Sequence, residues 1–171
     1  MADDDRIWQA MYLLHAKRTG HGLQLIHNPG MMNFVRDHSL CVEMYPSSNW
    51  QTNRFRLFDD RDGKGEVYPL SKYLEHGISV TVNTDNRFIS DTDLSNEFLM
   101  AARMTDGGLS RHEVLKIVRN GFQAAFLPRD ARDRLLKNVD DEIFEILKED
   151  FFPILTDRTP NSVYSDTSTG N

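Results

Sequence analysis

The chain has 171 residues, of which 39% are hydrophobic and 27% charged, and its net charge is −6. This composition is typical of a globular protein and excludes collagen-like, low-complexity and wholly disordered chains. The acidic balance gives no electrostatic reason to bind nucleic acid, and no apolar run reaches the ~20 residues that span a bilayer. A single cysteine, Cys41, excludes an internal disulfide framework. We therefore expect a cytoplasmic protein that binds neither nucleic acid nor a membrane.

Helix-like and strand-like segments alternate along the first half of the chain. Apolar residues at helical spacing predict helices, and short runs rich in β-branched residues predict strands. The expected elements are a helix over 5–17 that includes His15, a short strand over 18–20, a helix over 29–38 and a strand over 40–45. The polar stretch 47–66 is interpreted as a long loop, and loops of that length inside compact domains are usually functional or mobile.

The second half of the chain contains the clearest strand, over 78–83, because β-branched residues fill it. Four helices are expected around this strand, and Ser110 with Glu113 forms a capping box at the start of one of them. These helices cover 69–76, 93–104, 110–125 and a long charged segment from 128. Residues 156–171 lack periodicity and are expected to form a disordered tail behind a single folded unit over 1–155.

Strands separated by helices predict right-handed crossovers and a parallel sheet. A complete eight-stranded barrel needs about 250 residues, which is more than this chain contains. The fold class is therefore α/β, either part of a (β/α)8 TIM barrel or a small domain with a thin sheet.

Three polar clusters each follow the carboxyl end of an expected strand. They are Gly20-His21-Gly22, the residues from Pro46 to Asn49, and the residues from Asn83 to Asn86. Parallel α/β folds build their functional sites at that edge of the sheet. Each cluster also has a structural interpretation: His21 as a turn residue, the serines as capping or turn residues, and Asp85 as a helix cap.

The same clusters suggest a family. The motifs are Arg18-Thr-Gly-His-Gly22, Val42-Glu-Met-Tyr-Pro-Ser-Ser-Asn49, Val82-Asn-Thr-Asp-Asn86, and Asn120 followed by Phe126. Taken together, in order and spacing, they resemble the C-terminal half of the adenosine deaminase family over residues 5–150.

The resemblance implies a hydrolase of purine and nucleotide metabolism: a zinc-dependent barrel that converts adenosine to inosine and ammonia. It implies that His21 is catalytic and orients and deprotonates the attacking water, and that Asp85 is a zinc ligand. Asn86 stands where many members have an aspartate that contacts purine N7. An amide can donate to N7 without needing protonation, so we expect Asn86 to bind substrate.

The chain also departs from the family pattern. Members carry two zinc ligands as His-x-His and a third, with the proton-donating glutamate, in a His-Ala-Gly-Glu segment, and this sequence has neither. A catalytic zinc site usually has three protein ligands, so zinc is expected only in a completed site. The expected partners are a purine nucleoside substrate and either an N-terminal half-barrel chain or a second copy at the open sheet edge.

Three interpretations follow. The chain is the C-terminal portion of a deaminase and inactive alone, or a non-catalytic half-barrel that serves as a binding or interaction module, or an unrelated small α/β protein. An upstream reading frame encoding the two missing motifs would distinguish the first from the second.

Overall fold

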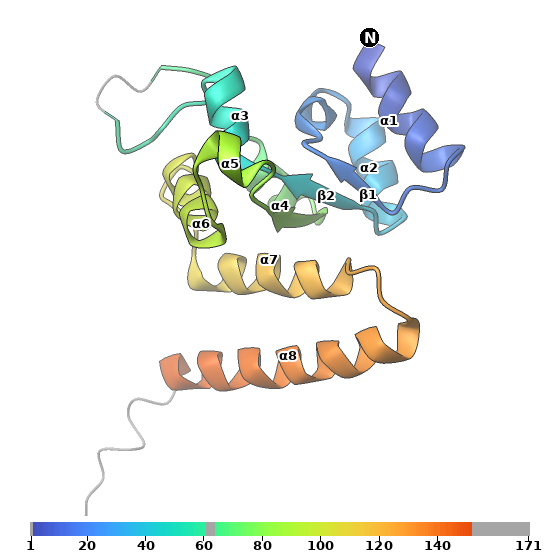
Figure 1. The fold of residues 1–171 in the computed structure, drawn as a ribbon, viewed down its shortest axis with the longest axis vertical. Helices are drawn as coiled ribbons and strands as arrows, with labels where there is room; N and C mark the ends of the chain where they lie inside the picture. Colours follow the sequence, from blue (N-terminus) through green and yellow to red (C-terminus); the bar gives the residue numbers. More distant parts are fainter. Residues whose placement is uncertain (1, 61–63, 152–171) are drawn as a thin grey trace, which may run out of the picture.

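The computed structural model describes residues 2–60 and 64–151. Its three strands form one parallel sheet in the order β1-β2-β3 (Figure 1). The strands are β1 (Arg18–Gly20), β2 (Cys41–Met44) and β3 (Ser79–Val82). Their parallel pairing and the shortness of β1 confirm the sequence-based prediction.

Five of the described helices precede β3 in the chain. They are α1 (Ala2–Tyr12), the 3-10 helix η1 (Leu23–His27), α2 (Pro29–Asp37), α3 (Pro46–Asn53) and α4 (Leu70–Glu75). In Figure 1, α1 and α2 lie beside β1, whereas α3 lies beyond the carboxyl end of β2.

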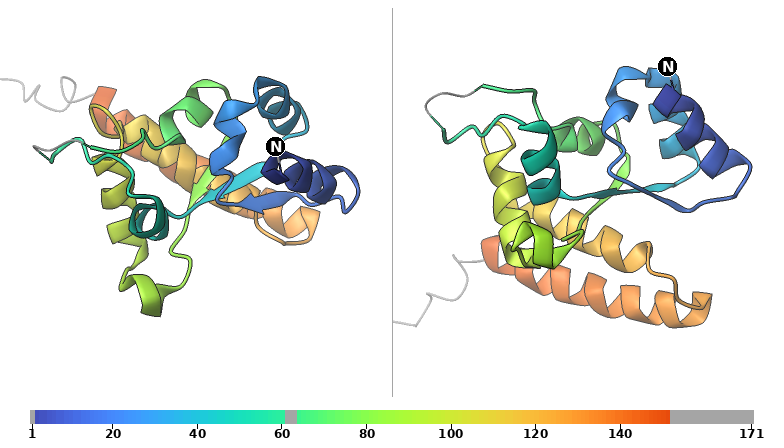
Figure 2. Two further views of the ribbon diagram at one scale, coloured as in Figure 1. Left: turned by 90° about the horizontal axis from the view of Figure 1, so that it is seen from above. Right: turned by 45° about the horizontal axis from the view of Figure 1, so that its top comes forward.

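Four helices follow β3, and the last two form a separate layer. They are α5 (Arg87–Ser90), α6 (Leu94–Arg103), α7 (Arg111–Gln123) and α8 (Arg129–Phe151). α7 packs on β3, and α8 packs on α7 from the outside (Figures 1 and 2). None of the helices within 2–60 and 64–151 is long and apolar enough to cross a membrane.

The sheet has one apolar and one polar face. Successive side chains of a strand point to opposite faces, so Val42 and Met44 share a face with Val80 and Val82, and all four join a buried cluster with side chains of α2 and α4. The opposite face carries Glu43 and Thr81 in β2 and β3. Thr81 on this second face is also buried. A parallel sheet with helices packed on its apolar face is consistent with part of a barrel.

The prediction of a loop over 47–66 is wrong at its start, because α3 occupies Pro46–Asn53. Proline at the first helical position has a φ angle that suits a helix. A contact from far along the chain also stabilises the start of α3. The Glu97 carboxylate in α6 accepts the backbone N–H of Ser47 at 2.9 Å.

The first helix ends earlier than expected, at Tyr12. His15 therefore lies outside a helix, with a left-handed φ of 53°. The short helix α5 was not predicted, whereas the helices after it begin and end within a few residues of the predicted bounds. Residues 156–171, the expected disordered tail, lie outside the described residues, and the boundary of the folded unit at 155 stays a prediction.

Candidate active site

The carboxyl ends of the three strands lie at one edge of the sheet, and one of the polar clusters follows each of them. His21 follows β1, Ser48 and Asn49 lie in the first turn of α3 after β2, and Asp85 follows β3. Asn49 is hydrogen-bonded to His21, and Ser48 is hydrogen-bonded to Asp85. The first turn of α3 thus contacts the two residues expected to be catalytic and metal-binding.

The Gly20-His21-Gly22 turn carries His21 past the end of β1. The φ angles of His21 and Gly22 are 59° and 60°, a left-handed region that residues with a side chain rarely occupy. The His21 N–H donates to the carbonyl oxygen of Glu43 at 2.8 Å. A Cβ atom on Gly22 would lie 2.7 Å from Cγ1 of Val42, so the turn requires glycine at that position.

Tyr73 of α4 holds this turn through its phenol group. Its side chain is fully buried, and its hydroxyl donates to the carbonyl oxygen of Gly22 at 2.6 Å. The same hydroxyl oxygen accepts the backbone N–H of Ile26 at 3.2 Å. Burial raises the pKa of Tyr73 above its ordinary value, so the phenol remains a donor at neutral pH.

Tyr73→Phe is expected to lower the free energy of unfolding by about 1–3 kcal/mol, because it leaves two backbone groups of the turn without their partner. The change can be measured from urea denaturation. Tyr12→Phe is the matched control, since Tyr12 is 57% exposed and its substitution should cost less than about 0.5 kcal/mol. Equal effects of the two substitutions would contradict the role given to Tyr73.

The imidazole of His21 belongs to a chain of hydrogen bonds that runs into the core. Asn49, which is 1% exposed, donates from Nδ2 to His21 Nδ1 at 2.8 Å and accepts the Tyr68 hydroxyl at 2.9 Å. Burial and, next, the charge of Glu97 raise the pKa of Tyr68 well above its ordinary value, so the phenol keeps the proton that it donates. With Nδ1 accepting, a neutral His21 carries its proton on Nε2.

A second chain of contacts holds the His21 ring from another side. Nε of Arg18 lies 3.1 Å from Oε1 of Glu43, and the Tyr45 hydroxyl donates to Oε2 at 3.0 Å. Burial and the Glu43 charge raise the pKa of Tyr45 above its ordinary value. The protonated Tyr45 ring packs against the imidazole with centroids 4.7 Å apart. The Asn49 amide and the Tyr45 ring therefore both restrict the position of the His21 side chain.

Asp85 also has a left-handed backbone, with a φ of 54°. Ser48 Oγ donates to its Oδ2 at 2.8 Å, whereas Oδ1 has no hydrogen-bond or ion-pair partner within 2–60 and 64–151. The interpretation of Asp85 as a helix cap is wrong, because the cap of α5 is the next residue, Asn86. Asp85 is exposed at the strand edge with one oxygen fixed and one oxygen available.

Asn86 uses one end of its amide to cap α5. Its Oδ1 accepts the backbone N–H groups of Phe88 and Ile89, both at 3.2 Å. This contact fixes the orientation of the amide and leaves Nδ2, for which the described residues provide no partner, as a hydrogen-bond donor. The geometry allows Asn86 to cap a helix and bind a ligand at the same time.

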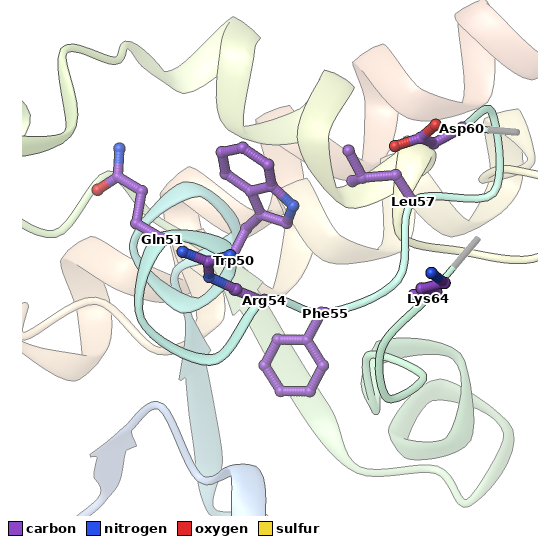
Figure 3. A pocket seen from close by; sticks show the side chains of 7 residues that line it. All are labelled: Trp50, Gln51, Arg54, Phe55, Leu57, Asp60 and Lys64. Atoms are coloured by element: carbon purple, nitrogen blue, oxygen red, sulfur yellow. The ribbon is translucent and has the colours of Figure 1, made fainter. Parts of the chain in front are cut away.

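Hollows lie near these residues in the part of the chain that the structure describes. One, of about 430 Å³, lies against α3 and the segment that follows it (Figure 3), and another, of about 510 Å³, is lined by Asn83 and Thr84 directly before Asp85. The first contains the Trp50 and Phe55 rings but not the predicted site residues. Its lining residues are Trp50, Gln51, Arg54, Phe55, Leu57, Asp60 and Lys64.

Within the described residues, no three His, Cys, Asp or Glu side chains come together in a group that could hold a metal ion. A catalytic zinc site usually takes three protein ligands. Asp85 is chemically suited to be one of them, but the described residues do not fit a complete zinc site.

The sequence did not indicate several residues that hold the predicted site residues in place, and Ser48, Asn49, Glu97 and Tyr68 are examples. Ser48 and Asn49 were noticed as a polar cluster, yet their direction depends on α3, which was not predicted. The sequence pattern could have indicated Glu97, since it is an acidic residue on the apolar face of the helix expected over 93–104. No such pattern indicated Tyr68.

The chain is similar to known deaminases. The adenosine deaminase family profile matches residues 1–142. An adenosine deaminase of Clostridium acetobutylicum is 32% identical over 136 residues, which are 80% of this chain and 38% of the relative. The chain thus spans about two-fifths of the length of this curated relative, and the interpretation as an unrelated α/β protein is excluded.

Solved structures show the same fold at low identity. The adenine deaminase of Arthrobacter aurescens is 19% identical with a TM-score of 0.66, and the match covers 81% of this chain and 40% of that one. An amidohydrolase of Burkhoderia ambifaria, solved with bound Zn, is 19% identical with a TM-score of 0.69 over 85% and 38% of the two chains. These structures support a partial TIM barrel. The family profile that matches residues 1–142 shows that the chain belongs to the adenosine deaminase family.

Proposed function

We propose that this chain supplies the C-terminal part of an adenosine deaminase active site, in which adenosine and water give inosine and ammonia. The observation that carries the proposal is the first turn of α3, which contacts His21 through Asn49 and Asp85 through Ser48. Membership in the family supports it, because adenosine deaminases are the curated relatives.

His21 is assigned to the attacking water. Deamination forms a bond from the water oxygen to C6 of the purine and breaks the bond from C6 to the amino nitrogen. Because Asn49 donates to Nδ1, Nε2 of the exposed imidazole carries the proton and can hold that oxygen by donating to it. To take up a proton from the water, Nε2 must be free, which requires the Asn49 amide to rotate so that its oxygen accepts from Nδ1. The rotated Nδ2 then donates to the Tyr68 hydroxyl oxygen, which replaces the bond that Tyr68 donates in this structure.

Asp85 is assigned to zinc. Ser48 fixes Oδ2 and leaves Oδ1 as the ligand oxygen. The remaining ligands, and the acid that protonates the purine, must come from residues beyond those described. Zinc bound in such a site would lower the pKa of its bound water to about 7.

Asn86 is assigned to purine N7, which only accepts hydrogen bonds. Asn86→Ala should cost about 1–3 kcal/mol in transition-state binding of adenosine, because a buried acceptor loses its donor. The measurement compares kcat/KM for adenosine and 7-deazaadenosine, and the preference for adenosine should largely disappear in the variant. Asn86→Ser is the control for the cap of α5, since serine can accept the same N–H groups, whereas its hydroxyl is shorter than the amide and does not extend to the position of Nδ2. If Asn86→Ser kept the preference for adenosine, the assignment would fail.

The proposal is tested with the chain alone and with a completed enzyme. The completed enzyme is a fusion in which this chain follows the part of the Clostridium acetobutylicum relative that the match does not cover. The chain alone is expected to have no measurable deaminase activity, whereas the completed enzyme is expected to release inosine when zinc is added. Zinc-dependent activity of the chain alone would contradict the first expectation.

The alternative function is a non-catalytic binding or interaction module. The absence of a metal-binding group within 2–60 and 64–151 favours it. A completed enzyme that folds, retains zinc and still makes no inosine would support this alternative and end the proposal of catalysis.

A further inference from the structure

Glu97 of α6 is a fully buried carboxylate that the proposed chemistry does not use. Its exposed fraction is 0%, its Oε2 accepts the Ser47 backbone N–H at 2.9 Å, and its Oε1 has no hydrogen-bond partner within the described residues. Burying a carboxylate with one oxygen unpaired is unfavourable for folding.

The contact with Ser47 places the carboxylate at the N-terminus of α3. The first N–H groups of a helix have no partner inside it, and the N-cap residue of α3, Tyr45, makes no side-chain hydrogen bond to them. Glu97 therefore caps α3 from another helix, and its negative charge also interacts favourably with the positive end of the helix dipole. α3 has only eight residues, so it has few hydrogen bonds of its own. The capping contact is therefore a large part of what fixes its position.

Ser48 and Asn49 directly follow the capped residue. Ser48 holds Asp85, and Asn49 holds His21, so one helical turn orients the two residues that come from different strands. We propose that Glu97 is a positioning residue that sets both contacts by fixing the first turn of α3. A role of Glu97 in catalysis rests on the proposed function. Its effect on the Ser48–Asp85 and Asn49–His21 contacts does not.

Two substitutions separate positioning from packing. Glu97→Gln keeps an oxygen that can accept the Ser47 N–H. Glu97→Met fills a similar volume without an acceptor. The matched control is Glu113→Met, since Glu113 accepts the N–H of Ser110 in the capping box of α7 and lies on a helix that does not carry site residues.

The readout is the N–H···N hydrogen bond between Asn49 and His21, which NMR detects as a scalar coupling between Nδ2 and Nδ1 in the ¹⁵N-labelled full chain without zinc or substrate. We expect the coupling in the unmodified chain, in Glu97→Gln and in Glu113→Met, and its loss in Glu97→Met. Retention in Glu97→Met, or loss in Glu97→Gln, would overturn the proposal. The outcome is independent of deaminase activity, so failure here and failure of the proposed function are distinguishable.

A second measurement needs no substitution. If the contact with Glu97 persists in solution, the Ser47 N–H exchanges with solvent at least tenfold more slowly than the Ser48 N–H, which has no partner among the described residues. Equal exchange rates would overturn the proposal even if Glu97→Met failed to fold.

Discussion

Asp85→Ala is expected to remove zinc and deaminase activity together from the completed enzyme. The substitution deletes a charged ligand from a set of few, and a catalytic zinc site cannot easily lose one. Zinc content per chain, measured after gel filtration, should fall to the level of the chain alone, and inosine formation should be undetectable. The metal measurement matters as much as the rate, because it reports on Asp85 without depending on catalysis.

Asp91→Ala is the matched control for this substitution. Asp91 is exposed and has a left-handed φ of 46°, so alanine is strained there as it is at position 85. The control should keep zinc and activity. Ser48→Ala should keep the metal but bind it about 10–100-fold more weakly, as is usual when the hydrogen-bond partner of a ligand is removed. If Asp85→Ala retained its zinc, the ligand assignment would be wrong.

Local sequence was sufficient for much of the fold. The run Ile78-Ser-Val-Thr-Val82 predicts β3, because β-branched residues favour a strand. Ser110 and Glu113 predict the start of α7, and both halves of that capping box are present. β1, with three residues, was predictable only from its place between two helices. These elements depend on neighbours in the chain, and such interactions are readable from a sequence.

Contacts between distant residues explain what could not be predicted. The segment Pro-Ser-Ser-Asn resembles a turn, and it forms α3 partly because Glu97 accepts the Ser47 N–H from fifty positions away. For the candidate site, the sequence indicated that His21 and Asp85 lie at the same edge of a sheet. It could not indicate the bonds from Asn49 and Ser48, since their direction follows from α3. The roles of His21, Asp85 and Asn86 stay predictions.

His21→Ala is expected to keep zinc in the completed enzyme but to lower kcat by roughly 10²–10⁴-fold, the range for losing a group that handles a proton in the transition state. The reason is that Nε2 is assigned to the water, whereas Nδ1 is already hydrogen-bonded to Asn49, so neither nitrogen is needed for the metal. Zinc content and the rate of inosine formation are measured on the same sample. His27→Ala is the control, because His27 is exposed in η1, six residues after His21, and its loss should leave both values unchanged. If His21→Ala lost zinc while Asp85→Ala retained it, the assignments of His21 to the water and Asp85 to zinc would be wrong. Membership in the family would not be affected.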